Sequence, residues 1–159
     1  LLLARATRSS QPGYDLFGHS AGGQILHRHA LLWQSPHARR VIAANAGFYT
    51  LPDLSRPLPV GVAGLGLDDR ALRRAFARDL TILLGEMDND PDRGGSHLHT
   101  PLIDQQGTNR LARGRYFHEF GRERARELGA DFRWSLEVVP GVGHDYRGMA
   151  RAAAKRLYG

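Results

Sequence analysis

Four short apolar runs, each followed by a helix-like or loop-then-helix pattern, constrain the fold of this chain of 159 residues most strongly. The runs cover residues 14–20, 40–47, 80–88 and 135–144. Strands that alternate with helices predict the α/β class, with a parallel sheet and helices on both of its faces. Right-handed crossovers then place the carboxyl ends of all four strands at one edge, where ligands bind in such sheets. The loops after the four runs are therefore where a site is expected.

Helix patterns fill most of the chain between these runs. An amphipathic spacing of apolar residues predicts four helices, over residues 22–33, about 68–78, about 108–129 and 146–157. Asp68 or Asp69 is a candidate N-cap, and Gly129 is a candidate left-handed C-cap. Residues 48–66 hold several prolines and glycines, which argues against regular structure there.

The loop after the first run holds a short motif with a chemical meaning. Gly18-His19-Ser20-Ala21-Gly22 fits the pattern G-x-S-x-G, in which a tight strand-to-helix turn presents a serine hydroxyl. The pentapeptide alone is a weak signal in a chain with 19 glycines. Its context is stronger, because an apolar run precedes it and an amphipathic helix pattern follows. Ser20 is thus either a nucleophile or a simple turn residue, and the context favours the nucleophile.

The third and fourth runs end in groups that would activate such a serine. Asp88 follows the third run and His144 follows the fourth, so that Ser, Asp and His occur in the chain order expected on this scaffold. A serine needs a histidine to take its proton, and the histidine needs a carboxylate to fix its tautomer. Asp90 is a rival acid in the same loop, but Asp88 is nearer the end of the strand. A capping role for Asp88 and a loop role for His144 are the simpler alternatives.

Other aromatic residues near these loops are weaker candidates. His19, beside the serine, is expected to line a pocket, and Phe48 and Tyr49, just past the second run, are candidate walls of an acyl pocket or simply core residues. His27 and His29 lie two apart in a helix pattern and so point to different faces, which indicates surface or packing roles.

A metal site is conceivable but not expected. His97 and His99 flank one leucine in a loop that also carries aspartates, and such groups bind transition metals. No third fixed ligand is evident, so the sequence predicts no metal. Cysteine is absent, which excludes thiolate metal sites, disulfides and cysteine nucleophiles.

The charge and hydropathy of the chain bear on its partners. The net charge of +6 comes almost wholly from arginines, with Lys155 as the only lysine, and these arginines are scattered rather than gathered in one tract. We expect no nucleic-acid partner, because no basic face or binding module is evident. No apolar run approaches the length of a membrane helix, so no membrane partner is expected either. The sequence does not indicate a cellular compartment.

The segments GHSAGG, LLGEMD and VPGVGHD resemble those of the α/β-hydrolase superfamily. The residues in and around these segments are most similar to those of bacterial serine esterases of the polyhydroxyalkanoate-depolymerase and feruloyl-esterase type. The resemblance implies a cofactor-free carboxylic ester hydrolase that acts on a small ester through an acyl-enzyme. In it Ser20 is the nucleophile, His144 the general base, Asp88 its partner and the Ala21 amide an oxyanion donor. A serine at this position argues against haloalkane and epoxide hydrolysis, whereas a peptidase or thioesterase would use the same triad.

The chain also departs from the family pattern. Family members have earlier strands, and a loop written H-G-G or H-G-x-G supplies their second oxyanion amide. Thirteen residues precede the first run here, so residues 1–159 are expected to form a single, N-terminally incomplete α/β-hydrolase domain that is poorly stable or aggregates when isolated. Losing one oxyanion donor costs about 2.7 to 4 kcal/mol. The alternative function is therefore a non-catalytic, hydrolase-like binding domain without a complete oxyanion hole.

Overall fold

The structure is a computed structural model and describes residues 6, 8, 10–33, 35–92 and 98–159. His97 lies outside the described residues. The elements, in chain order, are β1 (Tyr14–His19), α2 (Ala21–Leu32), β2 (Ala38–Ala44), α3 (Asp69–Phe76), β3 (Asp79–Gly85), the 3-10 turn η1 (Asp104–Gln106), α4 (Arg110–Glu127), β4 (Ser135–Val139) and α5 (Tyr146–Tyr158).

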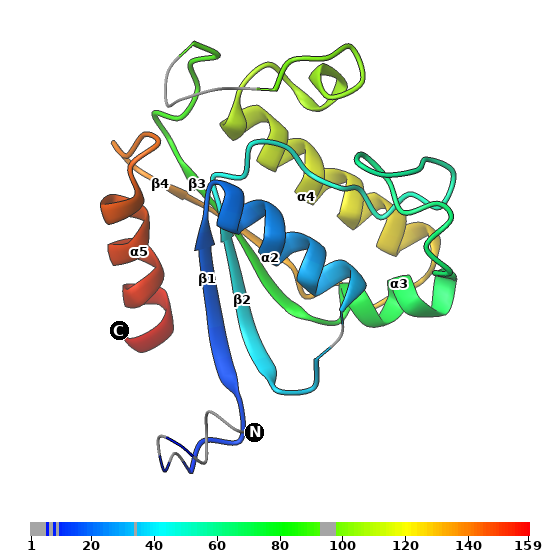
Figure 1. Cartoon of the computed structure of the whole chain (residues 1–159), viewed down its shortest axis with the longest axis horizontal. Helices are drawn as coiled ribbons and strands as arrows, with labels where there is room; N and C mark the ends of the chain where they lie inside the picture. The colour runs from blue at the N-terminus through cyan, green and yellow to red at the C-terminus, as the bar shows by residue number, and fades with distance from the viewer. Residues whose placement is uncertain (1–5, 7, 9, 34, 93–97) are drawn as a thin grey trace.

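The four strands form one parallel sheet in the order β1-β2-β3-β4, so the predicted fold class is confirmed. Helices α2, α3 and α4 cover one face of the sheet and α5 covers the other (Figure 1). The register pairs His19 with Ala44 and Gly85 with Val139, so the carboxyl ends of the strands lie along one edge. That edge is the one at which the sequence places its reactive residues.

Each face of the sheet packs its own apolar core. The larger core lies under α2, α3 and α4, where Phe117 stacks between Tyr49 and Trp134 with ring centroids 4.7 and 5.0 Å away. The smaller core lies under α5 and joins Ile42 to Met149. Burial of apolar side chains on both faces explains why the strands read as continuous apolar runs rather than as alternating ones.

Capping residues set the ends of the helices as predicted. The Asp68 side chain accepts a hydrogen bond of 2.8 Å from the Ala71 amide at the start of α3. Gly129, just after α4, has a φ of 58°, which is the left-handed conformation expected of a C-cap glycine. The strands end earlier than predicted, since β2 stops at Ala44 and β3 at Gly85. The residues that follow turn away to form loops at the site.

The irregular segment 48–66 is fastened to the rest of the molecule through Thr50. Its amide donates to the His27 ring at 2.9 Å, and its hydroxyl donates to the carbonyl of Pro59 at 2.7 Å. The other ring nitrogen of His27 lies 3.0 Å from the carbonyl of Gly23, so the ring donates through Nδ1 and accepts through Nε2. Of the two roles expected for His27, surface or packing, the structure shows packing, because the side chain is fully buried.

We expect the buried His27 to make folding stability fall at acidic pH. Burial lowers the pKa of His27 from 6.5 to about 3, so between these values the unfolded chain binds more protons than the folded one. Stability is therefore lost as pH falls through this window, with a slope that approaches about 1.4 kcal/mol per pH unit. Urea unfolding from pH 7 to pH 4 measures it. The part of the pH slope that comes from His27 should be missing in His27→Gln. It should remain in the control His37→Gln, which changes an exposed ring. Equal slopes of unfolding free energy against pH in the wild type and both variants would contradict this assignment.

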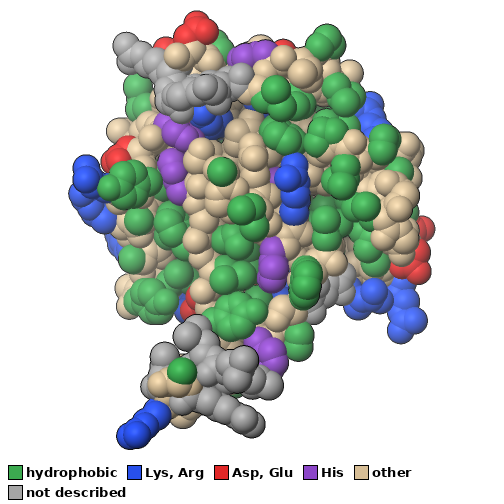
Figure 2. Space-filling view, in the orientation of Figure 1, with side chains coloured by type: hydrophobic (Ala, Val, Ile, Leu, Met, Phe, Trp, Pro, Cys, Tyr) green, Lys and Arg blue, Asp and Glu red, His purple; other side chains and the backbone are tan. Residues whose placement is uncertain are grey.

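The outer edge of β1 and the apolar side chains near it are exposed. Within the described part of the chain, β1 pairs with β2 alone. Tyr14 and Phe17 on this strand are 45% and 36% exposed. On the face seen in Figure 2, hydrophobic side chains are spread over much of the surface, and Lys and Arg side chains lie in separate places among and around them. The strand that carries the serine motif is thus an edge strand here.

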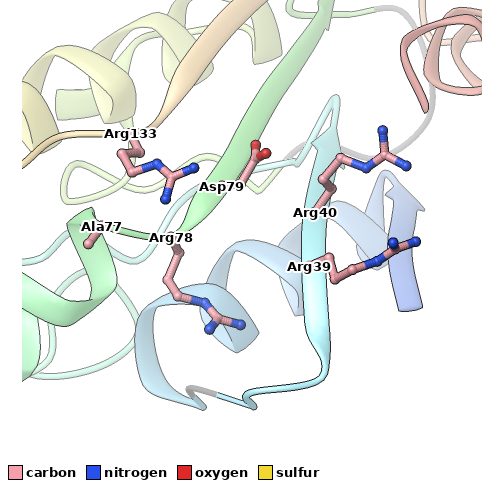
Figure 3. Close-up of a pocket in the computed structure, with 6 residues that line it drawn as sticks. All are labelled: Arg39, Arg40, Ala77, Arg78, Asp79 and Arg133. Carbon is pink, nitrogen blue, oxygen red and sulfur yellow. The ribbon is translucent and has the colours of Figure 1, made fainter. Parts of the chain in front are cut away.

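Several arginines lie at the edge of the sheet where the strands begin, opposite the edge formed by their carboxyl ends. A cavity of about 390 Å³ there is lined by Arg39, Arg40, Arg78, Arg133, Ala77 and Asp79 (Figure 3). Arg40 and Arg39 hold the Asp15 carboxylate at 2.6 and 3.3 Å, and Arg78 donates to the carbonyls of Ser35 and Ala38. The contacts with Asp15 join β2 to β1, and those of Arg78 hold the start of β2 and the segment before it, so most of the arginines at this edge have structural partners. No helix in the described part of the chain is long and apolar enough to cross a membrane.

Candidate active site

Ser20, His144 and Asp88 meet at the carboxyl edge of the sheet, although they come from three different loops. The His144 Nδ1 atom lies 2.8 Å from Asp88 Oδ2, and its Nε2 atom lies 3.0 Å from Ser20 Oγ. A carboxylate only accepts hydrogen bonds, so Nδ1 carries the ring proton and Nε2 presents a lone pair to the serine hydroxyl. This is the arrangement in which a histidine can withdraw a proton from a serine.

Ser20 sits at a strained turn between β1 and α2. Its backbone has φ 56° and ψ −116°, which is unusual for a residue with a side chain. The turn is held because the Ser20 amide donates to the Ala44 carbonyl at 2.9 Å and the Ser20 carbonyl accepts from Gln24 at 3.0 Å. Ala21 follows as the first residue of α2, where helix amides have no carbonyl partner within the helix. Ala21 is therefore still the candidate oxyanion donor.

The glycines of the motif are not equivalent. A Cβ atom added to Gly18 would lie 2.5 Å from the carbonyl oxygen of Gly22, and one added to Gly23 would lie 2.5 Å from that of Ala44. A Cβ atom added to Gly22 would meet nothing within 4 Å. Close packing of backbone on backbone, rather than backbone flexibility, therefore explains why Gly18 and Gly23 lack side chains.

We expect Gly18→Ala and Gly22→Ala to differ in sign. The first forces a methyl group against backbone and should lower the free energy of unfolding by about 1 to 3 kcal/mol. The second adds a better helix former in open space and should raise it by up to about 1 kcal/mol. Urea unfolding of the two variants beside the wild type measures both. Equal destabilisation by the two substitutions would show that the tight turn is not built as described.

Asp88 is buried and held by more than the histidine. Its side chain is 2% exposed, and its Oδ1 atom accepts from Arg110, itself 3% exposed, at 3.2 Å. The Asp88 carbonyl also accepts from the Leu111 amide at 3.1 Å, so the start of α4 grips this residue twice. Asp90, the rival acid, instead accepts from the Asp92 amide at 2.9 Å. The geometry thus favours Asp88 as the partner of His144.

Sequence reasoning missed Arg110. One signal was available, because an arginine in the first turn of a helix opposes the helix dipole and such a residue needs a reason to be there. The structure supplies the reason, since a buried carboxylate is costly unless it is paired. Arg110 provides the compensating charge on the side of Asp88 that faces away from His144.

His19 lies beside the reacting groups. Its ring centroid is 4.5 Å from that of His144, and the rings are tilted by 40°. Burial and the nearby charge of His144 lower the pKa of His19, so its neutral form is favoured. The structure therefore brings His19 to the site, where the sequence placed it, as a neutral ring.

Phe48 and Tyr49, the two candidate pocket walls, differ in burial. Phe48 is half-buried beneath the Arg28 guanidinium, which lies 5.2 Å from its ring centroid. Tyr49 is fully buried between His27 and Phe117, and this burial raises the pKa of its hydroxyl. Of the two roles open for Tyr49, pocket wall or core residue, the structure shows core packing, because the ring is fully buried.

Among the described residues, the loop around His99 does not form a metal site. His99 pairs with Asp104 at 2.9 Å. No group of three or more histidines, aspartates or glutamates positioned to hold a metal ion occurs in the described ranges.

Two solved structures share the fold of this chain and more than a third of its sequence. Poly(aspartic acid) hydrolase-1 from Sphingomonas sp. KT-1 superposes with a TM-score of 0.95 at 40% identity, over 99% of this chain. The LpqC poly(3-hydroxybutyrate) depolymerase from Bordetella parapertussis superposes with a TM-score of 0.91 at 36% identity, over 98% of it. The chain belongs to the α/β-hydrolase superfamily. This confirms the resemblance drawn from the three sequence segments.

A more distantly related structure shares only the fold with this chain. An IroE-like serine hydrolase from Shewanella oneidensis shares 16% identity at a TM-score of 0.51, over 98% of this chain and 44% of its own. A scan of family models and a search of curated proteins find no match. The chain spans 60% of the length of the Sphingomonas α/β hydrolase and 53% of that of the Bordetella one.

Proposed function

We propose that this α/β-hydrolase chain carries the catalytic triad of a serine hydrolase that cleaves carboxylic esters through an acyl-enzyme. The single observation that carries the proposal is the hydrogen-bonded series from Asp88 through His144 to Ser20, with distances of 2.8 and 3.0 Å. The names of the related structures, a hydrolase and a depolymerase, support the same class of reaction.

The reaction begins with the serine hydroxyl. Ser20 Oγ attacks the carbonyl carbon of the ester while His144 Nε2 takes the hydroxyl proton. The carbonyl π bond opens to give a tetrahedral intermediate with a negative oxygen. The Ala21 amide at the start of α2 donates to that oxygen, and the partial positive charge of the helix end adds to the stabilisation. The oxygen of the leaving alcohol then departs with the proton that His144 returns, and the acyl group stays on Ser20.

Water completes the cycle by the same route. His144 takes a proton from a water molecule, whose oxygen attacks the acyl carbon and displaces Ser20 Oγ. The proton then returns to the serine and the carboxylic acid leaves. Asp88 keeps the ring in the tautomer with its proton on Nδ1 and stabilises the imidazolium that forms twice in each cycle, while Arg110 balances the buried carboxylate.

The names of the two relatives point to acyl polymers as a candidate substrate class. One is a poly(aspartic acid) hydrolase and the other a poly(3-hydroxybutyrate) depolymerase. Both names describe cleavage at carbonyl groups that repeat along a chain. We propose that oligomers joined by such linkages, with an ester as the scissile bond, are substrates besides simple esters.

Turnover of p-nitrophenyl acetate and butyrate by the purified protein tests the proposal. We expect release of nitrophenol above the buffer rate and its loss after treatment with a fluorophosphonate, which reacts with activated serines. A folded protein that neither turns over these esters nor reacts with the probe would support the alternative, a hydrolase-like binding domain without a working oxyanion hole.

A further inference from the structure

Asn45 is a buried residue at the centre of the three loops that carry the triad, and the proposed mechanism does not use it. It follows β2 directly, is fully buried and has a φ of 44°, a left-handed value that a side chain seldom adopts. Its backbone amide donates to the Leu83 carbonyl at 3.1 Å. The backbone turns at this residue, and its side chain lies between neighbouring loops.

The side-chain amide of Asn45 joins the end of β3 to the loop that carries His144. The Gly85 amide donates to Asn45 Oδ1 at 2.8 Å, and Asn45 Nδ2 donates to the Gly143 carbonyl at 3.1 Å. A backbone amide can only donate and a carbonyl can only accept, so these two partners fix which end of the side chain is oxygen and which is nitrogen. Gly85 begins the turn to Asp88, and Gly143 directly precedes His144.

The same nitrogen also reaches the loop of the nucleophile. Asn45 Nδ2 lies 3.5 Å from Nε2 of His19, the residue before Ser20. An amide nitrogen only donates, so His19 must accept through Nε2 and carry its ring proton on Nδ1. Protonation of His19 would turn two donors toward each other and would place a positive ring 4.5 Å from His144, whose own ring becomes positive in the proposed reaction.

We propose that Asn45 is a positioning residue of this active site, which fixes the loops of Asp88 and His144 relative to each other and holds His19 as a neutral ring. The inference rests on the proposed function, because it assigns Asn45 to the triad of that reaction. The lowered pKa of His19 agrees with it. Without Asn45, the carboxylate and imidazole loops would lose their shared partner, and a misplacement of about 1 Å can cost about a hundredfold in rate.

The variant Asn45→Asp tests the proposal through its pH dependence. The protonated carboxyl group still offers one O–H to the Gly143 carbonyl, whereas the ionised group offers none and repels that oxygen. The titratable group in contact with Asn45 is His19. The charged or titratable groups that act electrostatically on His19 are His144, Asp88, Arg110 and Asp145. We expect kcat of the variant, divided by that of the wild type, to fall about a hundredfold as pH rises and the new carboxyl ionises, with KM little changed. In Asn45→Ala, which introduces no carboxyl group, the ratio should not fall as pH rises.

The matched control is Gln106→Glu. Gln106 is a buried amide whose two ends bond the backbone of Tyr49 at 2.9 and 2.7 Å, away from the triad. We expect this variant to melt at a lower temperature but to keep a kcat ratio that is flat with pH. A flat ratio in Asn45→Asp, or the same falling ratio in Gln106→Glu, would overturn the proposal.

Nitrogen NMR of the histidine rings supplies a readout that needs no turnover. In the wild-type protein near pH 7 the His19 ring should carry its proton on Nδ1, and in Asn45→Ala this preference should weaken. A wild-type ring protonated on Nε2, or unchanged rings in Asn45→Ala, would overturn the inference. If the wild type shows the expected tautomer but no ester turnover, the proposed function fails and the placement of His19 by Asn45 stands.

Discussion

The Ser20→Ala variant should lose ester turnover almost completely. Removal of the hydroxyl takes away the proposed nucleophile, Ser20 Oγ, which lies 3.0 Å from His144 Nε2. In serine hydrolases such a loss lowers kcat by about 10⁶-fold, and the residual rate comes from binding and oxyanion donors. Steady-state hydrolysis of p-nitrophenyl butyrate measures the effect.

The substitution should leave the fold intact. Ser20 is held at its positive φ by backbone bonds to Ala44 and Gln24, which the variant retains. We therefore expect an unchanged far-ultraviolet circular dichroism spectrum and a melting temperature no more than a few degrees from that of the wild type. Full activity in a folded Ser20→Ala protein would remove Ser20 from the mechanism.

The Asp88→Asn variant should show the second-largest loss, of about 10⁴-fold in kcat. An asparagine in this place keeps the volume of the side chain but can present its amide nitrogen to His144 Nδ1. The ring would then carry its proton on Nε2, the atom that must receive the serine proton. The effect should appear in kcat, with little change in KM.

Asp90→Asn is the matched control for the acid. Asp90 lies two residues along the same loop and accepts from the Asp92 amide, whereas Asp88 accepts from His144. We expect Asp90→Asn to keep most of the wild-type kcat, because the half-buried Asp90 side chain accepts from the Asp92 amide and not from the His144 ring. The reverse order of effects would make Asp90 the acid and would contradict the site described above.

The sequence predicted the fold class because its strands are buried on both faces. Runs such as residues 80–88 are almost continuously apolar, and the structure shows β3 buried along nearly its whole length. The positions of Ser20, Asp88 and His144 followed from the same pattern, since parallel strands deliver their carboxyl ends to one edge. The distances among the three side chains agree with that prediction.

The sequence did not predict the residues that support these three. Asn45 and Arg110 act through contacts with residues 98 and 22 positions away, which no local pattern shows. For Tyr49 the sequence left open whether the ring lines a pocket or packs in the core, and in the structure the ring packs in the core against Phe117. Position along the chain thus located the edge of the sheet, whereas the direction of each side chain depended on tertiary packing.

The most direct test of the proposed triad is the site at which a fluorophosphonate attaches. Ser20 Oγ should displace fluoride from the probe and form a phosphonate ester, and mass spectrometry of the digested protein should find the adduct on the peptide that contains Gly18 to Gly23. Labelling should disappear in Ser20→Ala and in wild type unfolded with urea. An adduct on another residue, or no adduct on a folded protein that hydrolyses esters, would contradict the assignment of Ser20 as the nucleophile.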